Sequence, residues 1–345
     1  MLYKSRMRKI VLGLVILVAI GLLVAYSMFF SDSVKLNEKS KLIYIHSGWS
    51  FEQVDQMLEE KHLISHPWGF RIFARYKKYN EAVIPGRYRI QNGMSNAQLI
   101  NMLVKGKQEQ ENISLHNIIW KGDLAGIVGS KMESDSAKFM EALNNATFLK
   151  QFGVNPTNVL AIFIPGTYKM YWTDSPEMFI AQMDSNYKRF WTKENRIKAA
   201  KAGLSPMQVT ILASIVQAEQ CLHMDEKPII AGLYINRIKK GIPLQSDPTL
   251  VYARGDFSIQ RVRDGDKLQD SPYNTYKHVG LPPGPINMPE PSSIDAVLNY
   301  DENDYLYMCA QADGTGRHHF SKTLEEQNKY AALYREYLNK RQIER

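Results

Sequence analysis

Glu219 is the residue whose chemical type and position most suggest catalysis. It lies at the end of an apolar stretch, ILASIVQAEQ, at residues 211–220. At helical spacing Leu212, Ile215 and Glu219 fall on one stripe, which begins at Gln208. An apolar wall raises the pKa of a carboxylic acid by desolvation, as a general acid near neutral pH requires. The alternative is an ordinary glutamate in solvent at a helix end, and this segment alone leaves both interpretations open.

Two polar segments follow in the chain and are typical of the walls of a binding groove. They read IPLQSDPTLVYARG at 242–255 and SPYNTYKHVGLPPGPINMPEP at 271–291. Proline- and glycine-rich loops form cores poorly, but their amide, hydroxyl and aromatic groups suit a polar polymer such as a sugar chain. The predicted substrate-binding residues are Gln245, Ser246, Asp247, Thr249, Tyr252, Tyr273, Asn274, Thr275 and Tyr276.

Other kinds of site find little support in the sequence. No segment resembles a phosphate loop, a zinc site or a nucleophile elbow, so we expect neither a metal nor a cofactor. His318 and His319 are adjacent, face opposite ways in a strand and have no third ligand nearby, so we expect surface or structural histidines. Cys221 and Cys309 fit neither a metal cluster nor a disulfide framework, and whether they pair stays open.

Helix signals predict how Glu219 is positioned. Ser205 is a favourable N-cap with proline next and Gln208 three residues on, which together predict a sharp helix start. A second helix is predicted over residues 225–241. Asp247 precedes Pro248, so we expect its backbone to lie outside the helical region, in a turn.

The N-terminus predicts a membrane anchor. Residues 10–30 contain no charge and are long enough for a helix that crosses a bilayer. Four basic residues and no acid lie within residues 1–9, which places that end in the cytoplasm. A cleaved signal peptide is the alternative, because Ala25-Tyr26-Ser27 resembles a cleavage site. The length of the apolar run favours the uncleaved anchor, with everything after residue 31 outside the cytoplasm.

Residues 40–108 contain two helices that begin with the same device. Each predicted helix has a glycine, then a serine cap, then a glutamine at the third helical position. Two such helices against a small sheet resemble the LysM-like module of cell-wall proteins. The alternative is that both helices simply share a favourable cap. The paired residues are Gly48 and Gly93, Ser50 and Ser95, and Gln53 and Gln98.

Composition describes a folded, basic protein. The 345 residues are 23% charged and 44% hydrophobic, enough for more than one core, with a formal net charge of +8. A positive balance suits an anionic polymer or a membrane surface. The charges are spread out, with no block of five like charges, which disfavours nucleic acid as a partner.

Four segments in order resemble the YceG-like family, the endolytic murein transglycosylases. They are SIVQAE (214–219), NRIKKGIPLQSDPTLVYA (236–253), SPYNTYKHVGLPPGPI (271–286) and ADGTGRHHFSKTLEEQN (312–328). The resemblance covers about residues 40–340. It implies an α+β protein of the inner (cytoplasmic) membrane, with a cytoplasmic N-terminus (1–9), a transmembrane helix (10–30), a LysM-like module (40–108) and an extracytoplasmic YceG-like catalytic domain (109–345).

The resemblance also implies a reaction and partners. The family cuts nascent peptidoglycan glycan strands within the chain and leaves 1,6-anhydro-N-acetylmuramic acid ends. The implied substrate is therefore the glycan strand, and peptidoglycan synthases are plausible partners.

Two positions depart from the family pattern. Many members carry acids at both positions that correspond to Gln217 and Glu219, and an acid often stands where this chain has Gly166. If the first acid of the pair were catalytic, this protein would be inactive. Helical geometry favours the second, because position 217 lies about 160 degrees around the helix from the stripe of Glu219.

The implied chemistry needs only one carboxylate. Glu219 would protonate the glycosidic oxygen and then accept the proton of the sugar's own 6-hydroxyl. Ser246, Asn274 and Tyr276 are the candidates for positioning the acetamido sugar. Two rivals stay open: a hydrolytic muramidase with Asp247 as second carboxylate, and a non-catalytic wall-binding scaffold, suggested by Gln217 and the LysM-like module.

Overall fold

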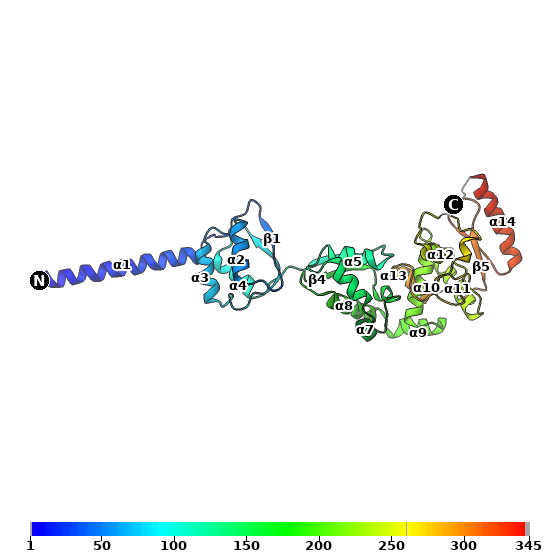
Figure 1. Ribbon diagram of the computed structural model, residues 1–345, viewed down its shortest axis with the longest axis horizontal. Helices are drawn as coiled ribbons and strands as arrows, with labels where there is room; N and C mark the ends of the chain where they lie inside the picture. Colours follow the sequence, from blue (N-terminus) through cyan, green and yellow to red (C-terminus); the bar gives the residue numbers. More distant parts are fainter. Residues whose placement is uncertain (1, 260, 342–345) are drawn as a thin grey trace. The chain divides into compact units, whose positions relative to one another are not determined.

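The computed structural model describes residues 2–259 and 261–341 (Figure 1). The chain divides into two compact units, and each is described here by itself. Unit 1 consists of residues 1–112, 131–133 and 169–174. Unit 2 consists of residues 113–130, 134–168 and 175–345.

Helix α1 (Leu2–Phe30) begins unit 1. Its segment Met7–Phe30 has a mean hydropathy of 2.8 and is long and apolar enough to cross a membrane. Its C-terminal end packs on the rest of the unit: the amide of Asn96 donates to the carbonyl of Met28 at 3.0 Å, and the rings of Phe29 and Phe73 lie 5.5 Å apart. The predicted apolar helix is confirmed.

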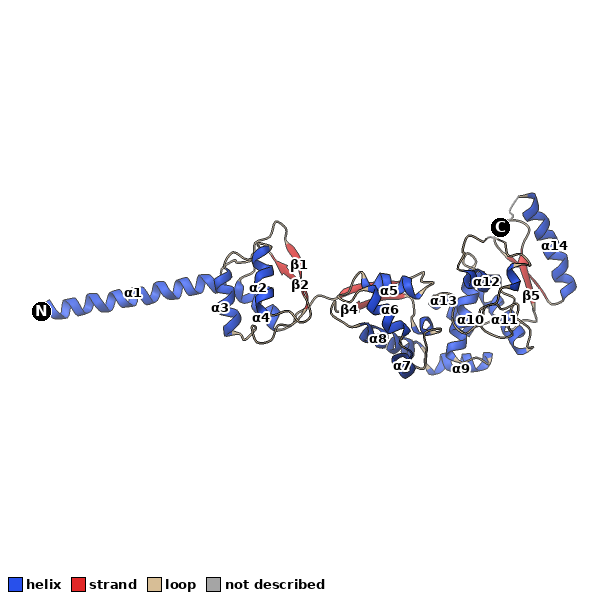
Figure 2. Ribbon diagram, in the orientation of Figure 1, coloured by secondary structure: helices blue, strands red, loops and turns tan. Residues whose placement is uncertain are grey.

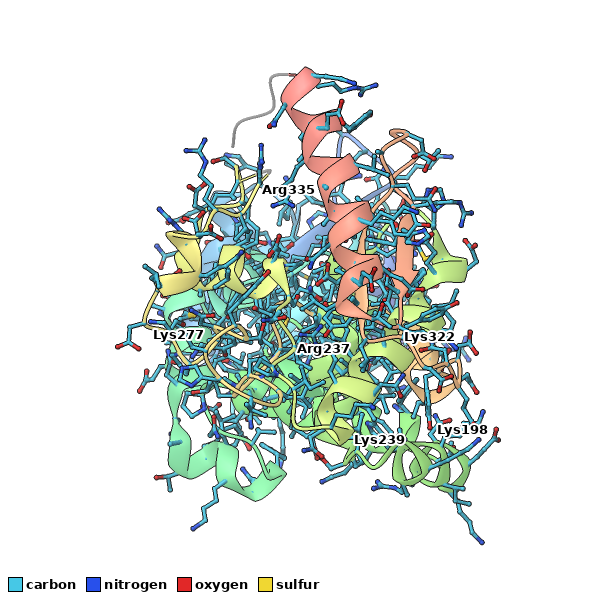
Figure 3. The ribbon with its side chains drawn as sticks, turned by 90° about the vertical axis from the view of Figure 1, so that its right-hand side faces the viewer. Lys198, Arg237, Lys239, Lys277, Lys322 and Arg335 are labelled. Carbon is cyan, nitrogen blue, oxygen red and sulfur yellow. The ribbon has the colours of Figure 1, made fainter. Side chains whose placement is uncertain are left out.

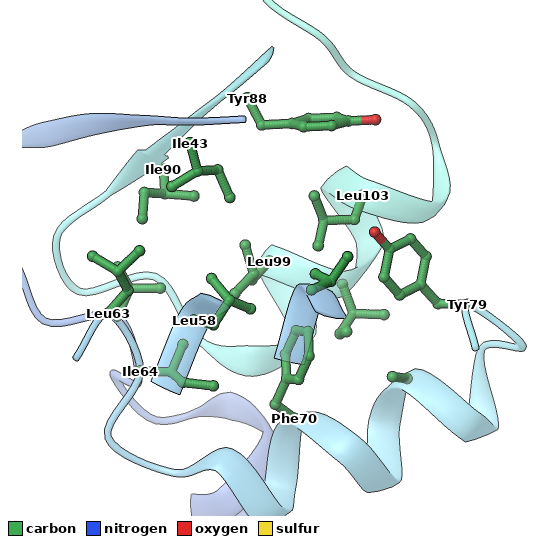
Figure 4. Packing of buried hydrophobic residues seen from close by; sticks show 14 of the residues in the cluster. Ile43, Leu58, Leu63, Ile64, Phe70, Tyr79, Tyr88, Ile90, Leu99 and Leu103 are labelled. Carbon is green, nitrogen blue, oxygen red and sulfur yellow. The ribbon is translucent and has the colours of Figure 1, made fainter. Parts of the chain in front are cut away.

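The rest of unit 1 is a small antiparallel sheet covered by helices. Strand β1 pairs with β2 from Ser40 opposite Gln91 to Ile45 opposite Gly86. Both predicted capping boxes are present, at the starts of α2 and α4. Apolar side chains from the strands and helices fill one core (Figure 4). The elements are β1 (Ser40–Ile45), α2 (Phe51–Glu60), α3 (Pro67–Tyr76), β2 (Gly86–Gln91) and α4 (Asn96–Val104).

Residues 111–190, most of which belong to unit 2, consist mainly of short helices and a second two-stranded sheet, in which β3 pairs with β4 (Figure 2). Helices α5 and α6 pack against each other, and α8 packs on α6. The elements are β3 (Glu111–Leu115), α5 (Lys121–Gly129), α6 (Ser136–Asn144), α7 (Ala146–Leu149) with the 3-10 turn η1 (Lys150–Phe152), η2 (Val159–Ile162), β4 (Gly166–Met170) and α8 (Pro176–Phe190).

The second part of unit 2 is built around a buried helix, α10, which packs on α11 and α13. A third sheet pairs β5 with β6 antiparallel, and α14 packs on it. The whole chain is therefore mixed α+β, as predicted. The elements are α9 (Lys193–Ala202), α10 (Pro206–Glu219), η3 (Met224–Glu226), α11 (Lys227–Lys239), α12 (Asp247–Arg254), η4 (Asp266–Leu268), α13 (Pro291–Leu298), β5 (Tyr307–Ala310), β6 (His318–Ser321) and α14 (Leu324–Lys340).

Helix α10 differs from the predicted single apolar stripe. Every residue from Val209 to Val216 is buried, because other elements of the unit surround the helix. Gln208, placed at the start of the stripe, is exposed instead, and its side chain accepts from the backbone N–H of Ser205 at 2.8 Å to complete the predicted capping box.

The expectation for Asp247 was wrong. Asp247 is the first residue of α12, with Ser246 as N-cap and Pro248 inside the first turn. A proline is tolerated there because the first N–H groups of a helix have no intrahelical partner. A polar sequence that resembled a loop is therefore a short helix over residues 247–254.

The cap at Ser205 provides a test of how α10 is stabilised. Replacing the hydroxyl in Ser205→Ala removes the acceptor for the N–H of Gln208 and is expected to lower the free energy of unfolding by about 1 kcal/mol. Ser205→Asp keeps an acceptor and is expected to retain wild-type stability. Urea unfolding measures both variants, and an Asp variant as unstable as the Ala variant would contradict the role of the cap.

Candidate active site

Glu219 is the last residue of α10, and two hydroxyl groups hold its carboxylate. Oε1 accepts a hydrogen bond from the hydroxyl of Tyr234 and another from the hydroxyl of Ser246, each at 2.5 Å. Tyr234 belongs to α11 and Ser246 caps α12. Three helices therefore fix the position of one carboxyl group.

Burial dominates the electrostatics of this carboxyl group. Desolvation raises the pKa of Glu219 above its usual value, and the nearby Asp247 adds to the rise. The hydrogen bonds from Ser246 and Tyr234 favour the charged form and offset part of this rise in pKa. The electrostatic effect of His318 acts in the same direction. The result is an acid that keeps its proton to higher pH than a glutamate in water.

Glu219 opens into a polar cleft of about 1070 Å³. The side chain is partly exposed, so a ligand in the cleft can reach it. Segments that are distant in sequence meet there, because α10, α11, the start of α12, the loop after residue 271 and the β5–β6 sheet all contribute to its wall. Among the lining residues are Gln245, Asp247 and Tyr276 of the predicted set.

Asp247 and Tyr276 form a second polar pair in this cleft. The tyrosine hydroxyl donates to Oδ1 of the aspartate. Desolvation raises the pKa of Asp247, whereas the tyrosine hydrogen bond lowers it by a smaller amount. The pKa of Tyr276 is raised by burial and by the neighbouring acid, so its hydroxyl stays protonated and remains a donor.

Three predicted substrate-binding residues lie beneath the cleft and join its two polar segments. Thr249, Asn274 and Thr275 are buried. The hydroxyls of Thr249 and Thr275 are 2.8 Å apart, and the hydroxyl of Thr275 accepts from the N–H of Ser246 at 3.0 Å. The amide of Asn274 donates to the carbonyls of Lys267 and Gln269 at 2.9 and 2.7 Å. These residues support the cleft wall from behind.

The two remaining predicted residues, Tyr252 and Tyr273, belong to an aromatic group. Their rings lie 4.8 Å apart, and Tyr252 also stacks on Trp120 at 4.5 Å. Tyr252 and the half-exposed Phe257 line an apolar pocket of about 390 Å³, which shares Asp247 with the polar cleft. Aromatic faces therefore line a pocket next to the carboxylate of Asp247.

Gln217 has a structural role, on a different side of α10 from Glu219. Its side-chain oxygen accepts from the backbone N–H of Glu290 at 2.7 Å and from the hydroxyl of Ser293 at 3.0 Å. Both donors belong to the N-terminal turn of α13, whose N-cap is Glu290. Residue 217 thus connects two helices, while Glu219 faces the cleft.

Sequence reasoning missed His318 and Tyr234 as parts of the site. His318 lines the cleft beside Glu219, and its Nδ1 lies 2.9 Å from the buried carboxylate of Glu226. The amide of Gln220 donates to the same carboxylate at 2.8 Å. Tyr234 reads in the sequence as one more apolar position of a helix. A signal for His318 was present, since the histidine pair lies in the last of the four family-like segments.

The structure also bears on the cysteines and on metal binding. Cys221 and Cys309 are both free thiols, and Cys221 is exposed. In residues 2–259 and 261–341, no group of three or more His, Cys, Asp or Glu side chains is arranged to hold a metal ion.

Comparison with known proteins identifies the family. Residues 43–332 match the sequence profile of the YceG-like family, which covers most of the chain. The chain belongs to the YceG-like family. A crystal structure of a YceG-like protein from Listeria monocytogenes is similar, with a TM-score of 0.53 and 27% sequence identity. That match covers 84% of this chain and 98% of the Listeria chain.

Curated relatives within the YceG-like family carry an enzyme name. The chain is 28% identical over 325 residues to a Bacillus subtilis protein named endolytic murein transglycosylase, a match that covers 90% of this chain and 89% of the relative. It is 27% identical over 330 residues to a Streptococcus pneumoniae protein of the same name, a match that covers 86% of this chain and 58% of the relative.

The bonds of Gln217 predict how this YceG-like chain responds to a change there. Gln217→Ala leaves the N–H of Glu290 and the hydroxyl of Ser293 without their acceptor and is expected to cost about 1–3 kcal/mol of unfolding free energy. Gln217→Glu keeps an acceptor and adds a negative charge at a helix N-terminus, so stability is expected to be retained. Urea unfolding measures both.

Glycan cleavage by the same variants separates structure from chemistry at this position. We expect Gln217→Glu to cleave at close to the wild-type rate, because residue 217 lies away from the carboxyl of Glu219. A rate that rises by orders of magnitude would show that an acid at this position takes part in the reaction.

Proposed function

We propose that this protein is a lytic murein transglycosylase that cuts peptidoglycan glycan strands within the chain. The observation that carries the proposal is the carboxyl of Glu219, desolvated at the end of a buried helix and open to a polar cleft. The names of the curated relatives support the same class of enzyme.

In the first step Glu219 acts as general acid. Two hydroxyl donors occupy Oε1, so the proton of the neutral acid resides on Oε2. That proton passes to the glycosidic oxygen as the bond from this oxygen to C1 of the muramic acid breaks. The raised pKa matters here, because an ordinary glutamate would already have lost its proton near neutral pH.

In the second step the same carboxylate acts as base. It accepts the proton of the 6-hydroxyl of the muramic acid while that oxygen forms a bond to C1. The product is a 1,6-anhydro ring, and Glu219 returns to its neutral form. Tyr234 and Ser246 donate to the carboxylate while it is charged, and this stabilises the intermediate state without a change of position.

The remaining polar groups position the sugar. Tyr276 and Asp247 form one fixed pair in the cleft and are proposed to bind the acetamido sugar. Ser246 acts through its bond to Glu219. Asn274 is buried, so its proposed role is to hold the loop that presents Tyr276.

A hydrolytic muramidase is the second candidate, because Asp247 lies in the same cleft as Glu219. A general base or nucleophile must be ionised. Desolvation raises the pKa of Asp247, and its hydrogen bond with Tyr276 occupies one of its oxygens. These features suit a binding group better than a nucleophile, which favours the lytic reaction.

We further propose where the protein works. Helix α1 would anchor it in the cytoplasmic membrane, with the basic N-terminus inside and the chain after residue 31 outside the cytoplasm. The order β1, α2, α3, β2 with antiparallel pairing supports a LysM-like module in residues 40–108, which would hold the glycan strand. Peptidoglycan synthases, which supply nascent strands, are the proposed partners.

The lytic proposal predicts a specific loss in Glu219→Gln. The amide can neither deliver a proton nor accept one, so the variant loses both the general acid and the general base. Cleavage of purified glycan strands is therefore expected to fall by at least about a thousandfold. The amide oxygen still accepts from Tyr234 and Ser246, so thermal unfolding is expected to show an intact fold. Ser205→Asp, at the far end of α10, is a matched control.

Mass spectrometry of the wild-type products separates the candidates. Anhydro ends, one water lighter than reducing ends, are expected. Reducing ends would identify a hydrolase, and strand binding without any cleavage would identify a scaffold. A Glu219→Gln variant with wild-type turnover would exclude Glu219 as the acid.

A further inference from the structure

The cleft that contains Glu219 carries more positive charge than a neutral sugar chain requires. Its lining includes three acids: Glu219, Asp247 and Asp264. It also includes five permanent cations, which come from α11, the segment around residue 263 and α14. These are Arg237, Arg261, Arg263, Lys267 and Arg335.

The acids offset this charge only in part. Desolvation raises the pKa values of Glu219 and Asp247, so both favour the neutral form more than an acid in water does. Asp264 forms a salt bridge with Lys267 at 2.8 Å. The arginines therefore dominate the field inside the cleft.

Two of the arginines, Arg237 and Arg261, are held in place by neutral acceptors. Arg237 donates to the carbonyls of Pro243 and Leu306 at 2.8 and 2.7 Å and is nearly fully buried. Arg261 donates to the side-chain oxygen of Asn339 at 3.1 Å. This bond connects the segment around residue 263 to the end of α14. A guanidinium fixed by neutral acceptors keeps its charge available for an anion.

Arg335 completes the arrangement on α14. It is exposed, lines the cleft, and its Nε donates to the carbonyl of Ala331 one turn earlier. Figure 3 labels Arg335 on α14 and Arg237 on α11. The positive charge thus extends from the floor of the cleft, at Arg237, to its rim.

We propose that this arginine-lined side of the cleft binds the carboxylates of the peptides attached to muramic acid. The inference rests on the proposed function and deepens it, because it names the form of substrate that the site takes. Glycan hydroxyls and acetamido groups are neutral, whereas stem peptides bring several carboxylates close to the bond that is cut. The enzyme therefore selects peptide-bearing strands over bare glycan.

The test compares three substrates of equal strand length with the full chain in detergent. One carries intact stem peptides, one has been stripped by an amidase, and one carries peptides whose carboxylates are converted to neutral amides. Wild type is expected to prefer the first over both others, mainly through a lower KM. This preference is expected to weaken as salt concentration rises, because salt screens charge pairs.

Two variants locate the preference in the arginines. Arg261→Gln and Arg335→Gln are each expected to lower the ratio of kcat/KM for peptide-bearing over stripped strands by about tenfold, the scale of one charge-assisted hydrogen bond. Arg335→Lys keeps the charge and is expected to keep most of the preference. Arg189→Gln, an exposed arginine on α8 outside the cleft, is the matched control and is expected to leave the ratio unchanged.

The outcomes are distinct. Equal cleavage of all three substrates by wild type, or a ratio that neither variant changes, overturns the inference and leaves the proposed activity standing. If strands with neutral amide peptides are cleaved as well as strands with charged peptides, the enzyme recognises the peptide by its size and not by its carboxylates. That result also overturns the inference. Failure of wild type to cleave any strand refutes the proposed function, and the inference falls with it.

Discussion

The site depends on one opposition of forces at the carboxyl of Glu219. Burial disfavours its charge and raises its pKa, while the hydroxyls of Tyr234 and Ser246, each 2.5 Å from Oε1, favour the charged form. A group that must first give and then take a proton needs both influences. Desolvation alone would hold the proton too tightly for it to be given up, and hydrogen bonds alone would leave a carboxylate that has already lost its proton and is too weak a base to take one back.

Much of unit 2 serves to hold those three groups together. Helix α10 is buried from Val209 to Val216, so its last residue can move little. Gln217 connects α10 to α13. The hydroxyl of Thr275 accepts from the N–H of Ser246, which places the cap of α12 against the loop that carries Tyr276. The carboxyl is therefore fixed by packing on one side and by a polar network on the other.

Local signals in the sequence predicted local structure well. The capping boxes at Ser50, Ser95 and Ser205 are all present, because a cap depends only on residues three apart. What the sequence could not supply depends on tertiary contacts. The helix that starts at Asp247 is capped by Ser246, whose N–H donates to the hydroxyl of Thr275, 29 residues away along the chain. The neighbour of Glu219 at His318 likewise comes from a distant strand.

The state of the Glu219 proton is the most direct test of this account. Carbon-13 NMR of the glutamate carboxyls, with Glu219→Gln used to assign the signal, measures the pKa of this one group. The account predicts a titration midpoint above the usual value, with cleavage activity lost as pH rises through that midpoint. A Glu219 signal that titrates at about 4.3, as glutamate does in water, would contradict it.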